Sequence, residues 1–396
     1  MAAPAFSISS LPAVDRRDVL RRDNDLMLAT VSNPVAPPCT LHDRQMLNFV
    51  SELRDSGYNL VNCAKRLDVF PRFGVNFWDS LRPEWKPQHG DLIDTLIELF
   101  IDGRQISRDR LTKHVSSEFV TSAIEMRLLQ DSGQYVQSEL CLFPCYGKYI
   151  ATDRAHKNSA INQVMWLWGE SFLLAGIVKR SPRRRAIDIG TGSGIHAILA
   201  SDHSEHVVAA DINPRALEFS QFNAALNGVH NVEFVLSDVF ESLSGTCDLL
   251  LANPPYAPDA AATAGDNFWS GGEDGTEILE RIVRAIPSRL DMNGECHINA
   301  LFPNAPGTTT KDHFNRWLNG DLDHYEVLDH TWPVPHYEDL LSERPYKGDK
   351  SAWRFGIVSL RRSATGKRYW RECTGRGLFF GSTGTCSVLA DFDVLE

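Results

Sequence analysis

Between residues 185 and 300, short apolar runs alternate with stretches of helical character, and this alternation most constrains the fold. Neighbouring parallel strands need crossover connections, which are usually helices. Alternating strands and helices therefore predict an α/β fold with a doubly wound, mainly parallel sheet. Helices are expected between the first five strands. The predicted strands cover residues 185–189, 206–210, 232–236, 248–252, 294–300 and 354–360.

The first of these strands runs into a glycine-rich turn in the sequence RAIDIGTGSGIHAILA (185–200). Gly190, Gly192 and Gly194 let the backbone turn tightly and approach a ligand closely. A dinucleotide-binding loop of this kind would carry a pyrophosphate. Here Asp188 precedes the glycines, and its carboxylate would repel a pyrophosphate but attract a ligand with a positive group. The loop therefore favours a cationic ligand over NAD.

Acidic residues also follow the next two predicted strands. Asp211 comes directly after the second strand, where a carboxylate can accept both ribose hydroxyls of a bound nucleoside. Asp238 follows the third strand, where its side chain or the neighbouring backbone can receive an adenine amino group. A single aspartate after a strand is more often a turn or helix cap. Three aspartates at successive strand ends on one sheet edge indicate a nucleoside site instead.

Together these motifs resemble those of class I S-adenosylmethionine-dependent methyltransferases. DIGTGSG is similar to their first motif, AADINPRAL to the acidic motif of the second strand, and SDVF to the adenine-side motif. The resemblance implies a Rossmann-like sheet of seven strands. It also implies S-adenosylmethionine as methyl donor, with S-adenosylhomocysteine as product. The cofactor-binding residues that it implies are Asp188, Gly190, Thr191, Gly192, Gly194, Asp211, Ile212, Asp238, Val239 and Asn253.

The fourth strand ends in the sequence LLLANPPYAPD (249–259), which supplies the predicted catalytic residues Asn253, Pro254 and Tyr256. The Asn253 side-chain oxygen and the Pro254 backbone carbonyl can accept both N–H groups of a planar NH2 group and aim its nitrogen at the methyl group. Pro255 restricts the backbone, and Tyr256 can stack on a flat acceptor. The motif resembles that of methyltransferases acting on exocyclic amines of adenine or guanine, or on the glutamine amide.

A later segment, FWSGGEDGTEILERIV (268–283), resembles the GG-x-DG segment of HemK-type protein-glutamine methyltransferases, although glycine-rich helix starts also serve capping alone. We therefore predict an N-methyltransferase that acts on a planar NH2 group such as a protein glutamine amide. Two alternative acceptors stay open: a small-molecule amine or amide, and an exocyclic amine of an RNA base. A non-catalytic binding module with the same fold is the alternative outside this class.

Further residues are expected to surround the acceptor. The aromatic stretch 329–355 is a candidate lid or substrate wall, although an ordinary surface excursion packed by its own aromatic residues is the favoured interpretation. Trp166 and Trp168 lie two positions apart in a predicted helix, so at least one of them is expected in the core. The candidate substrate residues are Pro255, Trp168, Glu170, His336 and Tyr337.

The residues before the predicted catalytic domain (154–396) form an arm over 1–40 and a smaller α+β domain over 41–153. In that smaller domain, short helices followed by a two-stranded hairpin indicate a winged helix. Its expected third helix, SSEFVTSAIEMRLLQD (116–131), carries one arginine against three acids, which disfavours DNA binding. The formal net charge of −11 likewise disfavours tight non-specific binding to nucleic acid.

The cysteine pattern and the apolar segments bear on metals and location. The 8 cysteines include no CxxC pair and no Cys/His cluster at zinc spacing, so no metal site is predicted. The N-terminal residues lack the pattern of a secretory signal, and the sequence contains no apolar run of about 18 residues that would span a membrane. A cytoplasmic location without membrane contact is therefore expected.

Overall fold

The computed structural model describes most of the chain from residue 35 onward. Residues 1–34 of the expected arm lie outside this description, as does the central part of the aromatic stretch. The described residues are 35–67, 86–87, 89–154, 162–167, 169–258, 270–333, 352–363 and 369–372.

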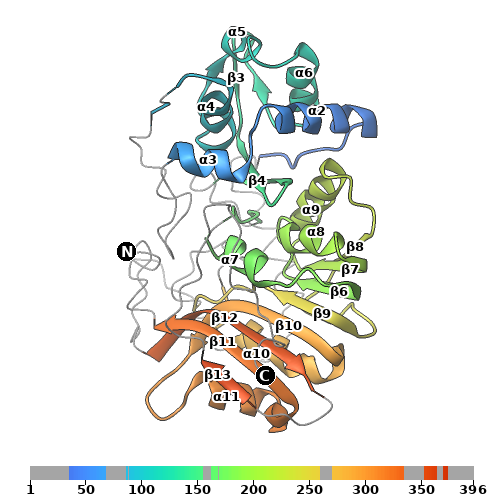
Figure 1. Cartoon of the computed structure of the whole chain (residues 1–396), viewed down its shortest axis with the longest axis vertical. Helices are drawn as coiled ribbons and strands as arrows, with labels where there is room; N and C mark the ends of the chain where they lie inside the picture. The colour runs from blue at the N-terminus through green and yellow to red at the C-terminus, as the bar shows by residue number, and fades with distance from the viewer. Residues whose placement is uncertain are drawn as a thin grey trace, which may run out of the picture.

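One sheet of eight described strands forms the centre of the second half of the chain (Figure 1). Its strands are β6 (Arg183–Ile189), β7 (Ser204–Asp211), β8 (Val232–Leu236), β9 (Cys247–Ala252), β10 (Leu290–Pro303), β11 (Tyr325–Pro333), β12 (Trp353–Arg362) and β13 (Tyr369–Glu372). They are ordered β13-β11-β12-β10-β9-β6-β7-β8, and only β12 runs antiparallel to its neighbours. The predicted mainly parallel sheet is confirmed, but it has eight described strands instead of seven.

Helices cover both faces of this sheet. They are α7 (Gly169–Ile177), α8 (Ile195–Ser201), α9 (Pro214–Leu226), α10 (Glu277–Arg289), α11 (Thr310–Trp317) and the 3-10 helix η3 (Asp321–His324). Helices α7 and α8 share a buried apolar cluster with Ala186 of β6, whereas α10 and α11 share another with Ile187 and Ile189. Successive strand residues point to opposite faces, so these clusters lie on opposite sides of the sheet. None of the described helices combines the length and apolar character needed to span a membrane.

The sheet differs from the prediction in two places. No helix connects β8 to β9, because residues 237–246 form a turn. The Ser237 hydroxyl closes this turn, donating to the Val239 carbonyl at 3.0 Å and accepting from the Ser242 N–H at 3.0 Å. The other difference is the two strands β11 and β13, which were not predicted. The apolar pattern of β11 is interrupted by buried Glu326 and Asp329. The partners of these charges, Arg361 and Trp370, lie on other strands, so the sequence of β11 alone does not read as a strand.

The first part of the chain holds many short elements, shown at the top of Figure 1. Strands β1, β3 and β2 form a small antiparallel sheet, and β4 pairs with β5 as a hairpin. Two helices over residues 41–69, three further short helices and one hairpin were expected here, so the three-stranded sheet is additional, and the winged helix stays a prediction. The elements are α2 (Asp43–Asp55), α3 (Leu60–Leu67), α4 (Leu92–Leu96), the π-helix η2 (Ile97–Ile101), β1 (Ile106–Ser107), α5 (Arg108–Leu111), α6 (Ser117–Glu125), β2 (Gln130–Asp131), β3 (Tyr135–Gln137), β4 (Leu140–Cys145) and β5 (Lys148–Asp153).

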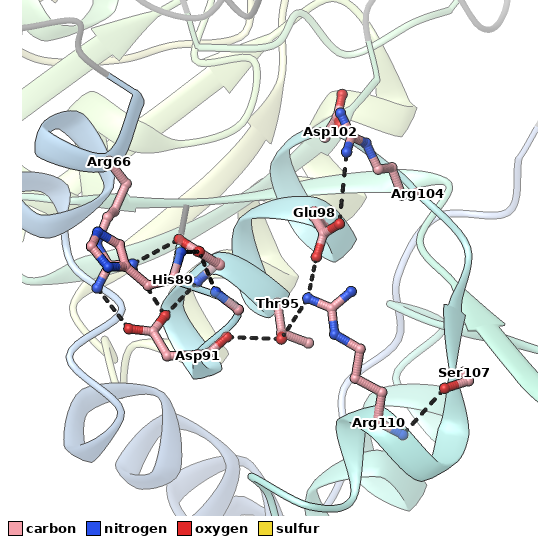
Figure 2. A network of polar contacts seen from close by, with 11 residues as sticks. Arg66, His89, Asp91, Thr95, Glu98, Asp102, Arg104, Ser107 and Arg110 are labelled. Atoms are coloured by element: carbon pink, nitrogen blue, oxygen red, sulfur yellow. Dashed lines mark hydrogen bonds and ion pairs between the residues drawn. The ribbon is translucent and has the colours of Figure 1, made fainter. Parts of the chain in front are cut away.

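A polar network fixes α4 and η2 to their neighbours, as Figure 2 shows. Asp94, fully buried, accepts a hydrogen bond from Arg66 of α3 at 2.7 Å, and Asp91 pairs with the same guanidinium. One turn further on, buried Glu98 pairs with Arg110 of α5. Each of these carboxylates has an arginine partner, with Arg66 shared by Asp91 and Asp94, so the network ties the helices together.

Helix α2 covers α6, the helix that a winged helix would place in a DNA groove. The rings of Phe49 and Phe119 stack with centroids 4.4 Å apart. Beside them, the Asn48 amide donates to Glu118 at 3.1 Å, and the carboxylate of Glu52 accepts from the Ser116 backbone N–H at 3.0 Å. The exposed acids of α6 are thus engaged by α2 or face solvent as negative charges. Neither arrangement suits contact with phosphates.

Side chains of α9 join the first part of the chain to the sheet. The carboxamide of Asn227 exchanges two hydrogen bonds with the main chain of Tyr149, at 2.8 and 2.7 Å. One turn earlier, Asn223 does the same with Ala151, at 2.8 and 2.9 Å. Asn223 also donates to the Ser193 carbonyl in the glycine-rich turn at 2.8 Å. The main chain of the hairpin strand β5 is therefore hydrogen-bonded to α9 side chains of the second half of the chain.

Candidate active site

The glycine-rich turn after β6 is shaped by Asp188. Its Oδ2 accepts hydrogen bonds from the Thr191 hydroxyl at 2.6 Å and from the Ala197 N–H at 3.1 Å. Its Oδ1 is buried and has no hydrogen-bond partner among the described residues. Burial raises the pKa of Asp188 to about 7. A buried carboxylate oxygen without a partner is costly unless a donor reaches it, which marks this atom as a contact for a ligand.

The glycines of the turn have two distinct roles. All three have positive φ, which L side chains rarely adopt. A Cβ at Gly194 would lie 2.7 Å from the Ser220 Cβ, so this position packs against α9. A Cβ at Gly190 or Gly192 would meet no atom within 4 Å. These two glycines therefore border open space, where a ligand can approach the backbone.

Asp211 at the end of β7 lies beside the same turn. Its Oδ2 accepts from the Gly192 N–H at 2.8 Å, and its Oδ1 from the Asn213 N–H at 2.9 Å. Burial raises its pKa. The next residue, Ile212, is 49% exposed, and Leu236, which pairs with Asp211 on β8, is 55% exposed. A carboxylate next to exposed apolar surface suits a nucleoside, whose sugar is polar and whose base is flat and apolar.

Asp238 is engaged by another side chain. Its Oδ1 accepts a hydrogen bond from Arg281 of α10 at 2.8 Å, which fixes its orientation. Val239 follows with a φ of 52°. This left-handed conformation is unusual for a β-branched residue and accompanies the closed turn at Ser237. The sequence-predicted residues therefore lie at the carboxyl ends of β6, β7, β8 and β9, which are neighbours in the sheet.

Asn253 leaves β9 beside the fully buried Asn299 of β10. The Asn299 Nδ2 donates to the Asn253 Oδ1 at 3.2 Å. Sequence reasoning missed Asn299, although an asparagine inside the mostly apolar run HINALF (297–302) is a signal that could have found it. A carbonyl oxygen has two lone pairs, so the Asn253 Oδ1 can still accept a bond from an acceptor NH2 group.

Glu170 of α7 lies behind the same residues. It is buried and accepts a hydrogen bond from the Tyr256 hydroxyl at 2.8 Å, and the side chain of Asn253 lies close enough to lower its pKa. Burial raises the pKa of Glu170 to about 7, while these two side chains oppose that shift. The ring of Tyr256 is itself buried and meets Phe355 edge-on, with centroids 6.0 Å apart. Stacking of this ring on an acceptor stays a prediction.

The GG-x-DG segment packs directly on the exit of β9. The Gly271 N–H donates to the Ala257 carbonyl at 2.8 Å. A Cβ at Gly275 would lie 2.6 Å from the Tyr256 carbonyl oxygen, and one at Gly271 would lie 2.9 Å from the Pro255 carbonyl oxygen. The glycines are therefore required for close packing of backbone against backbone, which the sequence alone did not distinguish from simple capping.

Several candidate residues lie outside the structural description. Trp168, His336 and Tyr337 are among them, so their predicted contact with an acceptor stays a prediction. Trp166 is buried, in agreement with the expectation that one tryptophan of the pair belongs to the core. Within the described ranges, no group of three or more His, Cys, Asp and Glu side chains is arranged to hold a metal ion.

Comparison with known proteins places these residues in a family context. A family model described as the methyltransferase small domain matches residues 168–315. Over 134 residues the chain is 35% identical to a Methanocaldococcus jannaschii protein predicted to be a protein N5-glutamine methyltransferase, covering 33% of this chain and 68% of that protein. It is 34% identical over 139 residues to the release factor glutamine methyltransferase of Deinococcus radiodurans, covering 33% of this chain and 50% of that enzyme.

A third relative has a different acceptor in its name. The chain is 29% identical over 137 residues to ribosomal RNA small subunit methyltransferase C of Cronobacter sakazakii, covering 34% of this chain and 36% of that enzyme. All three matches therefore involve about a third of this chain. The chain spans two thirds of the first relative, half of the second and about a third of this one.

Proposed function

Because this chain belongs to the methyltransferase small domain family of class I S-adenosylmethionine-dependent methyltransferases, we propose that it methylates a planar NH2 group, such as a protein glutamine side-chain amide. The observation that carries the proposal is the position of Asn253. It leaves β9 next to β6 and its glycine-rich turn, with one lone pair of its Oδ1 still available. A methyl acceptor held there would lie beside the donor site.

The residues present fit S-adenosylmethionine. The buried Oδ1 of Asp188 suits the donor's amino group, the carboxylate of Asp211 suits ribose hydroxyls, and Ile212 offers apolar surface to the adenine. We assign the adenine side to Asp238 and Val239. When bound, the donor supplies a methyl group whose transfer forms an N–C bond, breaks the S–C bond and releases S-adenosylhomocysteine and one proton.

The protein contributes orientation of the acceptor. The nitrogen of an amide is a weak nucleophile because its lone pair is delocalised. Acceptance of its two N–H bonds by the Asn253 Oδ1 and the Pro254 carbonyl raises electron density on nitrogen and fixes its direction of attack. Pro255 keeps the backbone of these two acceptors rigid. The proton is released from a strongly acidic product, so no strong base beside the nitrogen is required.

The acceptor class rests on the relatives. Two of the three relatives above carry names for glutamine methylation, and the GG-x-DG segment packs against the Asn-Pro-Pro-Tyr motif as a unit. The third relative acts by name on ribosomal RNA, so an exocyclic amine of an RNA base is the second candidate. The formal net charge of −11 favours a protein or small-molecule acceptor over a polyanion.

We also propose that residues 41–153 form an accessory domain and that 154–396 form the catalytic domain. The order α4–η2, β1, α5, α6, β2, β3 supports a winged-helix-like arrangement in the accessory part. The cover of α2 over α6 disfavours DNA as its ligand. We infer that this part contacts the methyl acceptor or steadies the catalytic domain.

Two measurements test the proposed function. Calorimetric titration should show S-adenosylmethionine binding at micromolar to low-millimolar concentration, and no binding would refute the methyltransferase. Tritiated donor incubated with cell extract should then label the protein fraction. Label confined to the RNA or small-molecule fraction would replace glutamine with that acceptor class. Asn253→Ala should bind the donor normally and transfer no label, and wild-type transfer by this variant would show that the acceptor site lies elsewhere.

A further inference from the structure

The side-chain amide of Asn253 has two ends of nearly equal shape and opposite hydrogen-bonding character. Only its oxygen can accept an N–H bond from a methyl acceptor, and rotation by half a turn about the last bond would present the nitrogen instead. A working site therefore needs neighbours that distinguish the two ends. The described neighbours of this amide are Glu170 on one side and Asn299 on the other.

These two neighbours have complementary character. An ionised carboxylate can only accept, and the pKa of Glu170 is lowered by the Asn253 side chain, whose sole donor is its NH2 group. Asn299 donates its Nδ2 to the Asn253 Oδ1 at 3.2 Å. In the rotated arrangement, the Asn253 oxygen would face the Glu170 carboxylate with no proton between them. Contact between two acceptors is repulsive, and burial of Glu170 leaves no water to relieve it.

We propose that Glu170 is a positioning residue which, in its ionised form, keeps the Asn253 oxygen turned toward the methyl acceptor. The inference rests on the proposed function, because it assigns a task to Glu170 in the same reaction. Glu170 acts through Asn253, and the Tyr256 hydroxyl holds the carboxylate in place from a second side.

The protonation state of Glu170 decides between the two orientations. Burial raises its pKa to about 7, so the carboxyl can change its charge near neutral pH. A protonated carboxyl can donate to the Asn253 oxygen and so stabilise the rotated amide. Asn299 can accommodate this rotation, because its Oδ1 is buried with no hydrogen-bond partner among the described residues and can accept from the Asn253 NH2 group. The rotated form turns a donor toward the acceptor nitrogen.

Other ionisable groups near α7 already have defined partners or a fixed charge state. On β10, Glu295 pairs with Arg183, and the His297 Nδ1 is bonded to the Ser359 hydroxyl at 2.8 Å. On α8, burial lowers the pKa of His196 to about 3, so this ring is neutral. Burial also raises the pKa of Tyr256 far above neutrality. Burial also raises the pKa of Asp188, in the donor site, to about 7, so the pH dependence of kcat is measured with saturating donor.

Glu170→Gln tests the inference, because it keeps the shape and removes the carboxylate. In the wild type at saturating tritiated donor, the rate of methyl transfer should rise with pH as Glu170 ionises near pH 7. In Glu170→Gln, kcat should fall at least tenfold at pH 8 and lose this pH dependence, with donor affinity unchanged within twofold. Glu98→Gln is the matched control, because Glu98 is also buried but belongs to the distant network of Figure 2. A wild-type pH profile in Glu170→Gln would overturn the proposal.

Tyr256→Phe tests the same inference if Glu170→Gln does not fold. The Tyr256 hydrogen bond lowers the pKa of Glu170, so its loss should move the midpoint of the activity profile to higher pH. An unchanged midpoint would contradict the proposal.

A readout without a methyl acceptor separates failure of this inference from failure of the proposed function. The side-chain NH2 resonances of Asn253, identified by their loss in Asn253→Ala, should shift with pH around 7 in ¹⁵N-labelled wild type and stay constant in Glu170→Gln. Absence of the shift in the wild type would refute the role of Glu170 even if methylation occurs. A shift without any methyl transfer would instead refute the proposed function.

Discussion

The hydroxyl of Tyr256 donates a hydrogen bond to the buried carboxylate of Glu170 at 2.8 Å, joining the exit of β9 to helix α7. This bond stabilises the ionised carboxylate but does not outweigh its burial, because the pKa of Glu170 stays at about 7 against a usual value of 4.5. Folding therefore favours the protonated form of this group. The raised pKa of Glu170 therefore affects the stability of the protein as well as the positioning of the methyl acceptor.

We predict that Glu170→Gln is more stable than the wild type at pH 8. The folded pKa is raised, so the stability associated with protonated Glu170 is fully present below pH 4.5 and is lost as pH rises through about 7. One pKa unit corresponds to about 1.4 kcal/mol, so the variant should gain roughly 2–3 kcal/mol relative to the wild type between pH 4.5 and pH 8. Urea denaturation at the two pH values measures this difference. An equal difference at both would contradict the raised pKa.

Asp188→Asn is expected to weaken donor binding and to stabilise the unliganded protein. The asparagine oxygen can keep the bonds from Thr191 and Ala197, while the charge that attracts a positive group is lost. We expect donor affinity to fall by about 10- to 100-fold, equivalent to roughly 1.4–2.8 kcal/mol. Calorimetry gives the affinity and thermal denaturation gives the stability. Asp248→Asn, at the opposite end of the sheet, is the control, and equal donor affinities for both variants would rule out the assigned contact.

Wild-type donor affinity should depend on pH for the same reason. The pKa of Asp188 is raised to about 7, so below that pH the carboxyl is protonated and no longer attracts a cation. We expect the dissociation constant to rise by up to about tenfold for each pH unit below 7, because one proton competes with one ligand. Titrations at pH 5.5, 6.5 and 8 measure this slope. Loss of the slope in Asp188→Asn would assign it to this carboxyl, whereas its persistence there would assign it to another group.

Alanine substitutions in the glycine-rich turn should distinguish the glycine needed for packing from the glycine needed for close approach of a ligand. At Gly194 a Cβ would lie 2.7 Å from the Ser220 Cβ, so Gly194→Ala combines a steric clash with an unfavourable φ. We expect a loss of about 2–4 kcal/mol in the free energy of unfolding. Gly190→Ala meets no atom and should lose only about 1–2 kcal/mol, but it should weaken donor binding. Chemical denaturation of both variants checks this order, and similar losses of stability would contradict it.

Asn223→Ala should reduce both stability and donor affinity. Its carboxamide bonds the main chain of Ala151 and also the Ser193 carbonyl of the glycine-rich turn. Loss of these buried bonds should cost about 2–4 kcal/mol. Asn227→Ala is the matched control, because Asn227 bonds Tyr149 in the same manner without a contact to that turn. Calorimetry should show weaker donor binding for the first variant only, and equal binding by both would argue against a link through Ser193.

The sequence predicts the parts of this fold whose signals are local. Asp188 and Asp211 lie at the carboxyl ends of their strands and Asn253 directly follows β9. Parallel strands bring these ends to one edge, so spacing along the chain determines their proximity. The role of Asn299 depends instead on which strand lies beside β9. The same holds for Asp329, whose partner Trp370 lies far along the chain. When the hydrogen-bond partner of a buried polar side chain lies far away in the sequence, the neighbouring residues do not indicate the structural role of that side chain.

The cover of α2 over α6 shows a further limit. The sequence of α6 suggests a poor DNA-binding helix because of its acids, but it does not show that Asn48 and Glu52 of α2 bond to its first turn. The winged-helix-like order of elements is visible in the chain. Which surface of that arrangement is free for a partner is determined only by packing.

The contact between α9 and β5 depends on a coincidence of two repeats. Asn223 and Asn227 are one helical turn apart, which is about 6 Å, while Ala151 and Tyr149 are two strand residues apart, which is about 6.7 Å. Because these two spacings are nearly equal, both carboxamides can reach the main chain of β5 at the same time. A one-residue insertion or deletion in either segment would misalign the pair. The four-residue spacing of the two asparagines and the two-residue spacing of their partners in β5 must therefore be retained together.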